Sequence, residues 1–162
     1  MDDLLTAIIG ILGLFLTFIG FWAASNYDRM TRYNYLAERW YNLMGLNDDM
    51  PEFFNPEETK KYTTWSDEKT KTKYNQYARA CWGFVEDIVG NDSWSWSYTE
   101  DYKDTIKDFI EHHHTWLLVN IDLFSSNKFW KVLERKREFR EKIGKLNPDL
   151  YKYMEKKVKK KD

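Results

Sequence analysis

The sequence predicts an all-α protein, in which an N-terminal transmembrane helix continues into a cytoplasmic antiparallel helical bundle. Residues 4–24 form an uncharged apolar run of 21 residues. As a helix, this run spans roughly 31 Å at about 1.5 Å per residue, which matches a bilayer core. The rest of the chain spaces its apolar residues by three or four, as amphipathic helices do. The one alternating stretch, residues 93–98, has no obvious partner strand, so we expect a connector there.

Composition narrows the protein class further. An aromatic content of 18% argues against a disordered chain. A single Cys excludes a disulfide scaffold and a multi-Cys zinc site. The net charge of -1 is the sum of an acidic part and a basic part of the chain. Residues 1–127 carry 11 Lys and Arg against 20 Asp and Glu, whereas residues 128–162 carry 14 against 6. The length allows about one domain beyond the anchor.

The apolar run is expected to stay in the protein as a membrane anchor. A cleavable signal peptide begins with positive charge and has a shorter core, whereas this chain has Asp2 and Asp3. Residues 23–25 resemble a cleavage site, so removal is the alternative. Arg29 and Arg32 follow the run, and positive residues stay in the cytoplasm. We therefore expect a single-pass protein of the cell or inner membrane, with its N-terminus outside and its C-terminal domain cytoplasmic.

Small residues follow one face of the anchor at spacings of 4, 3, 4, 3 and 4. Such a stripe lets two helices approach closely in lipid, and its repeat favours a left-handed crossing. The alternative is the general richness of transmembrane helices in glycine. We expect a packing face toward another copy or a different membrane protein. The stripe comprises Thr6, Gly10, Gly13, Thr17, Gly20 and Ala24.

The helix is predicted to continue past the anchor, because no Gly or Pro occurs between Phe21 and Met44. Gly45 is the expected C-terminal cap, and residues 47–54 are expected to connect. Asn55 followed by Pro56 then predicts a short helix, since Asn caps a helix and Pro suits its first position.

Four more helices are expected along the chain. The next begins at Ser66 and ends at residues 90–91. Its apolar face comprises Tyr74, Tyr77, Ala78, Cys81, Trp82, Val85, Ile88 and Val89. Thr99 caps a helix whose apolar side comprises Tyr102, Ile106, Phe109, Ile110, His113, Trp116 and Leu117.

Residues 125–127 are expected to separate two helices. The helix that follows carries the apolar residues Phe129, Val132, Leu133, Phe139 and Ile143. Asn147 opens the final helix, whose apolar residues are Leu150, Met154 and Val158. The predicted organisation is an anchor at 1–30, a cytoplasmic helical domain at 31–146 and a basic C-terminal helix at 147–162.

Three consecutive histidines are the most conspicuous motif. Neighbouring residues on a helix point about 100° apart, so His112, His113 and His114 cannot face one metal ion. Of the three, only His113 is expected on the apolar face. Glu86 is its best partner in the sequence. Such a pair could do acid–base work, but a structural polar pair within the bundle is the favoured interpretation.

No other pattern predicts catalysis or a cofactor. Di-metal carboxylate bundles repeat Glu-x-x-His on two helices, whereas Glu111 and His114 form a solitary instance. Phosphate-binding glycine loops and nucleophile elbows are missing from the sequence. Cys81 lies within an apolar stripe, where a thiol is usually inert. We therefore predict no metal site, no cofactor and, on balance, no enzyme.

A cluster of lysines ends the chain. Such a cluster can simply complement a helix dipole and keep the chain soluble, and this interpretation stays open. It can also bind anionic lipid headgroups, since an anchor holds the domain close to the bilayer. Nucleic acid is disfavoured, because no aromatic residue interleaves the terminal lysines. The cluster comprises Lys156, Lys157, Lys159, Lys160 and Lys161.

Several stretches within residues 1–125 carry a loose resemblance to a known group. They are Trp40-Tyr41-x-Leu43, Pro51-Glu52-Phe53-Phe54-Asn55-Pro56-Glu57-x-Thr59, Tyr74-x-x-Tyr77-Ala78-x-x-Cys81-Trp82, Glu86-Asp87-Ile88, and His113 with Thr115 and Trp116. Together they resemble a group of small uncharacterised prokaryotic membrane proteins with one N-terminal transmembrane helix. The resemblance implies this architecture and no catalytic residue.

The favoured function is non-enzymatic: a cytoplasmic helical domain that binds a partner, on an anchor that self-associates. One alternative is a membrane-tethered enzyme or effector that uses Glu86 and His113. The other is a membrane-bound binder of nucleic acid or anionic lipid that uses the lysine-rich tail.

Overall fold

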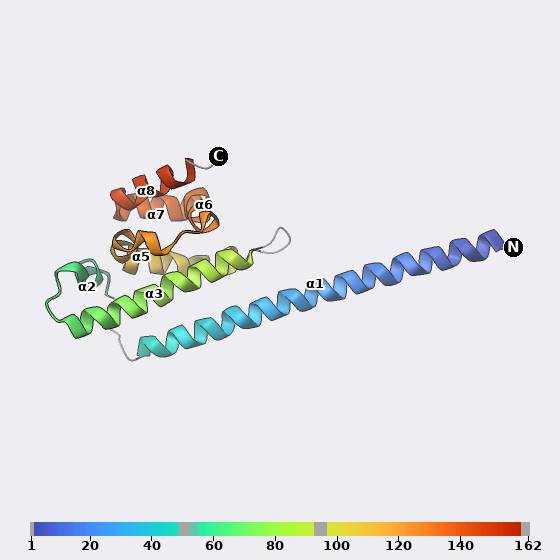
Figure 1. Cartoon of the computed structure of the whole chain (residues 1–162), viewed down its shortest axis with the longest axis horizontal. Coiled ribbons are helices and arrows are strands. Elements are labelled where there is room, and N and C mark those ends of the chain that lie inside the picture. The colour runs from blue at the N-terminus through green and yellow to red at the C-terminus, as the bar shows by residue number, and fades with distance from the viewer. Residues whose placement is uncertain (1, 49–52, 54, 93–96, 160–162) are drawn as a thin grey trace. The chain divides into compact units, whose positions relative to one another are not determined.

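The computed structural model describes residues 2–48, 53, 55–92 and 97–159, and over these residues the all-α prediction is confirmed (Figure 1). Eight α-helices, joined in places by short 3-10 turns, are the regular elements of this described part, which contains no strand. The chain divides into two compact units, Met1–Ala37 and Glu38–Asp162.

Helix α1 (Asp2–Asp48) is a single long helix that begins in the first unit and ends in the second. Its continuation past the apolar run is as predicted. The expected cap at Gly45 is wrong, because α1 continues to Asp48 and no described glycine has a positive φ. A glycine inside a helix costs only about 1 kcal/mol relative to alanine, so the flanking residues can carry the helix through it.

The next two helices begin with side-chain caps. Asn55 caps α2 (Pro56–Thr59) as predicted, and its Oδ1 accepts a hydrogen bond from the Glu57 amide at 3.0 Å. Helix α3 (Glu68–Asn91) begins two residues after Ser66, where its start was predicted. Its cap is Asp67, whose carboxylate accepts from two backbone amides of the first turn. A charged acceptor suits the positive end of the helix dipole.

Thr99 does not cap the following helix. It lies inside α4 (Tyr98–Asp101), which is followed by α5 (Lys103–Val119). The Thr99 amide donates to Oδ1 of Asp92 at 2.9 Å, and its hydroxyl donates to the other oxygen of that carboxylate. Asp92 therefore holds the start of α4 against the end of α3. Residues 93–96 of the alternating stretch lie outside the described residues.

The single helix predicted for residues 129–143 is two helices in the structure. Helix α6 (Asn127–Arg135) and helix α7 (Arg137–Leu146) are separated by Lys136, which has extended backbone angles. The last helix, α8 (Pro148–Lys159), begins as predicted, because the Leu150 amide donates to Oδ1 of Asn147 at 3.0 Å.

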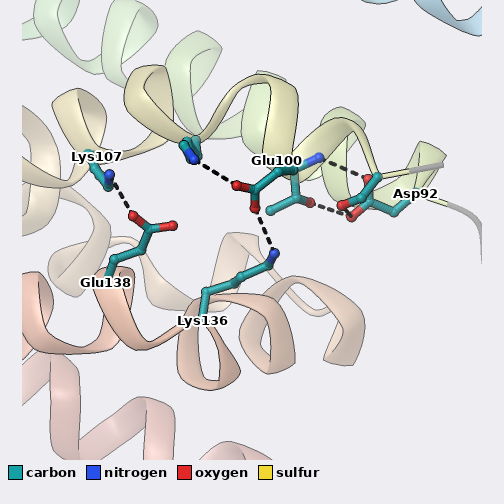
Figure 2. Close-up of polar contacts among 8 residues, drawn as sticks. Asp92, Glu100, Lys107, Lys136 and Glu138 are labelled. Carbon is teal, nitrogen blue, oxygen red and sulfur yellow. Dashed lines mark hydrogen bonds and ion pairs between the residues drawn. The ribbon is translucent and has the colours of Figure 1, made fainter.

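Ion pairs join α4 and α5 to the Lys136 break and α7 (Figure 2). The Glu100 carboxylate accepts from Lys103 at 2.7 Å and from Lys136 at 3.0 Å, and these cations lower the pKa of Glu100 to about 2. Lys107 pairs with Glu138 at 2.6 Å. Exposed ion pairs add little stability, so the network mainly fixes how these helices lie against one another.

The core of the second unit is rich in aromatic rings. Trp82, Trp116 and Trp130 have almost no exposed surface. Each indole N–H has an acceptor, as burial requires. The acceptors are the carbonyl oxygen of His113 at 3.2 Å, Oδ1 of Asn75 at 2.9 Å and the carbonyl oxygen of Phe124 at 2.7 Å, respectively. All residues predicted for the apolar faces of α3 and α8 are buried.

Candidate functional site

The first candidate site is the apolar part of α1. Within Gly10–Leu46, an 18-residue window reaches a mean hydropathy of 1.3, and none of it is buried. By length and composition, α1 is a candidate membrane span. Large apolar side chains stand exposed along it, with Phe18 at 69% and Phe21 at 73%.

The small-residue stripe leaves open space along this helix. A Cβ atom built on Gly10, Gly13 or Gly20 meets nothing within 4 Å, and Ala24 is exposed. The Thr17 hydroxyl donates to the Gly13 carbonyl at 2.8 Å, so its polar group is satisfied within the helix. The side chain of Thr6 lies outside the described residues.

His113 lies in the core of the second unit with no exposed surface. Its Nδ1 atom lies 3.1 Å from the Tyr74 hydroxyl, and its Nε2 atom has no hydrogen-bond partner in the described structure. The expected pairing with Glu86 is therefore wrong. Burial, together with the neighbouring His112 and His114, lowers the pKa of His113 to about 3.

His114 is also buried, although it was expected off the apolar face. The Asn147 side-chain amide donates to its Nδ1 at 3.2 Å, which places the imidazole proton on Nε2, an atom with no partner in the described structure. Burial and the charge of Lys60 lower the pKa of His114 to about 4. Asn147 thus both caps α8 and holds this histidine.

Acid is expected to destabilise the fold through these two histidines. In the unfolded chain, both imidazoles bind protons near the ordinary pKa of 6.5, whereas the folded values are about 3 for His113 and about 4 for His114. Below about pH 6.5 the unfolded chain therefore binds more protons than the folded chain. The contribution of the two histidines to the free energy of unfolding is fully present only above that pH. It falls by about 1.4 kcal/mol per pH unit per histidine as the pH decreases toward the folded pKa values.

Thermal melts of the full chain in neutral detergent measure this dependence between about pH 7.5 and 4.5. Because carboxylates also titrate in this range, the comparison is with the His113→Gln, His114→Gln variant, which should show a shallower pH slope. An equal slope in both proteins contradicts the assignment.

Glu86 lies instead in a surface groove of about 370 Å³ that also contains Arg39 and Arg79. Burial, and then the charge of Asp87, raise the pKa of Glu86. Arg39 pairs with Asp87 at 3.0 Å rather than with Glu86. Cys81 is fully buried, which raises the pKa of its thiol and keeps it protonated. Within the described residues, no group of His, Cys, Asp and Glu side chains is placed to hold a metal ion.

The lysine-rich tail is only partly described. Lys156, Lys157 and Lys159 occupy the last turn of α8, and the Lys157 ammonium lies 5.9 Å from the centre of the Tyr153 ring. Lys160 and Lys161 lie outside the described residues. The opposite face of α8 is buried, so the tail is in part the outer face of a packed helix.

A second basic surface, missed in the sequence, lies on α6. The α6 groove has a volume of about 500 Å³ and is lined by Lys128, Lys131, Val132, Arg135 and Lys136. The sequence does indicate this surface, because Lys128, Lys131 and Arg135 are three and then four residues apart, as residues on one face of a helix are. The denser cluster of lysines at the end of the chain is the more conspicuous positive charge in the sequence.

No protein family model, curated protein or solved structure matches this chain. The resemblance to small prokaryotic single-pass proteins therefore stays a prediction.

Proposed function

We propose that this chain is a single-pass membrane protein whose Glu38–Asp162 unit is a cytoplasmic interaction domain. The observation that carries the proposal is the bare apolar surface of α1, where Phe18, Phe21 and Trp22 are 69%, 73% and 63% exposed. An apolar helix of a soluble core is covered by its own protein, and this one is not. Lipid provides the missing cover.

The polar groups of the apolar run support insertion in lipid. Thr17 is the one hydroxyl-bearing residue between Gly10 and Ala24, and its hydroxyl bonds to the Gly13 carbonyl. The helix satisfies its own backbone groups. A segment of this kind meets the main requirement of hydrocarbon, which offers no hydrogen-bond partners.

An interaction role is favoured over catalysis because the groups suited to acid–base work are sealed from solvent. His113 and Cys81 have no exposed surface, so no substrate reaches them. Glu86 is more accessible, but it makes no hydrogen bond to His113.

The positive charges after the apolar run support a cytoplasmic second unit. Arg29 and Arg32 follow the run, while Asp2 and Asp3 precede it. A reporter that is active only in the cytoplasm should therefore be active when it is fused after Asp162. A reporter that needs export should be inactive at the same position. The reverse pattern contradicts the proposed orientation, and the same two fusions before Leu4 are the matched control.

We propose in addition that the small-residue stripe is where two anchors pack together. Replacing Gly13 and Gly20 by Ile should weaken self-association, because the added side chains separate the helix backbones. A two-hybrid reporter for membrane segments, or energy transfer between labelled chains in vesicles, measures the change. Ile11→Leu, which leaves the stripe intact, is the control and should associate normally. Normal association of the double variant removes the stripe as an interface.

A further inference from the structure

The α6 groove is lined by four basic residues, of which Lys136 is paired with Glu100. Lys128, Lys131 and Arg135 share one face of the helix, because they are spaced by three and four residues. Glu134 is the one acid of α6, and it lies three residues from Lys131 and next to Arg135. Helix α6 thus carries three cations against one acid.

Two ends of the groove are held by hydrogen bonds. The Lys128 ammonium donates to the carbonyl oxygens of Asp92 at 2.8 Å and Gly90 at 3.4 Å. The Lys136 ammonium donates to Glu100 at 3.0 Å (Figure 2). The framework around the middle of the groove is therefore fixed by contacts with other helices.

Arg135 stands between these fixed ends. It is exposed, and no carboxylate among the described residues forms an ion pair with it. Some other cations of the unit do pair with acids nearby in the sequence, as Lys60 does with Glu57 at 2.8 Å and Arg137 with Glu141 at 2.7 Å. The Arg135 guanidinium retains donors for a planar or tetrahedral oxyanion, which it can bind with two parallel hydrogen bonds.

We infer that the α6 groove binds the phosphate of an anionic phospholipid headgroup. Its volume of about 500 Å³ lies in the range of small-ligand sites. Val132 contributes an apolar surface beside the cations, which suits the hydrocarbon that adjoins a lipid headgroup. The inference rests on the proposed function, because an anchored chain meets such headgroups at high effective concentration.

The aromatic residues of α6 argue against single-stranded nucleic acid as the ligand. Proteins that bind it stack bases on exposed rings along a basic groove. Phe129 and Trp130 have no exposed surface, so α6 offers no ring for stacking.

The test uses the full chain in a neutral detergent and short-chain lipids below their micelle concentration. Dihexanoyl phosphatidylglycerol should bind, and dihexanoyl phosphatidylcholine should not, as measured by titration calorimetry. Lys131→Gln with Arg135→Gln should weaken binding by about tenfold or more, since two cations near the headgroup are lost. Lys69→Gln with Lys73→Gln removes the same charge from the exposed side of α3 and should change binding by less than about twofold. Circular dichroism melts should show that both variants are folded.

Several results overturn the inference. Equal weakening by the two double variants indicates unspecific attraction to positive charge, and no binding of phosphatidylglycerol removes the site. Inorganic phosphate that competes as well as the lipid assigns the groove to free phosphate. A 20-base-pair DNA duplex that binds more tightly than the lipid assigns it to nucleic acid. The Lys131→Gln, Arg135→Gln variant should still resist carbonate extraction from membranes, so failure of the groove is distinguishable from failure of the anchor.

Discussion

Leu14→Lys combined with Phe18→Lys is expected to remove the protein from the carbonate-resistant membrane fraction. Both side chains are exposed, at 74% and 69%, so neither change disturbs packing within the chain. A lysine near the centre of a transmembrane helix costs about 2.5–3.5 kcal/mol, and the apolar contribution of each original residue is lost as well. The combined loss of roughly 6 kcal/mol should leave most of the protein extractable or degraded.

The matched control places lysines on exposed apolar residues of the second unit. Val119 and Leu123 are 59% and 51% exposed, so Val119→Lys with Leu123→Lys adds the same charge without touching α1. This variant should stay in the membrane fraction. If the α1 variant also stays there, lipid does not cover α1, and the proposed anchor is contradicted.

Trp82→Ala is expected to unfold the second unit or to lower its stability severely. Trp82 has no exposed surface, and its ring lies 6.1 Å from that of Phe129. Removing a buried tryptophan side chain costs about 3–5 kcal/mol. The change also removes the hydrogen bond from the indole N–H to the His113 carbonyl, which contributes about 0.5–1.5 kcal/mol. These losses approach the total stability of an ordinary domain, about 5–15 kcal/mol.

Denaturant or thermal melts in neutral detergent measure this loss of stability. Tyr41→Ala is the control, because Tyr41 is 74% exposed and its removal should change the free energy of unfolding by less than about 0.5 kcal/mol. Trp82→Phe keeps most of the apolar surface and should fall between the two. Equal melts for Trp82→Ala and Tyr41→Ala would show that the α3 core does not hold the unit together.

Features with a local cause could be predicted from the sequence. Asn55 and Asn147 cap helices because their side chains reach an amide two or three residues ahead, within one turn. The apolar faces of α3 and α8 follow from spacing alone, since one face of each helix must be covered. The candidate span likewise follows from length and hydropathy.

Features that depend on contacts between helices could not be predicted in this way. The burial of His114 depends on Asn147, a residue of the α8 cap, and not on the α5 pattern. Tyr74 lies more than three helical turns before Glu86, the predicted partner of His113, and only the packing of α3 against α5 selects it. The break at Lys136 carries no Gly, Pro or capping residue, and its partner Glu100 lies on another helix.

The packing of α3 also sets the order of events while the chain is being synthesised. Helix α1 leaves the ribosome first, so the anchor can insert before any partner of α3 exists. Trp82 meets Phe129 of α6, and Lys128 of α6 holds the last carbonyls of α3, so the apolar face of α3 is complete only after α6 has emerged. Nascent chains that end between these helices present an uncovered aromatic face, and chaperone binding during translation should be concentrated in that interval.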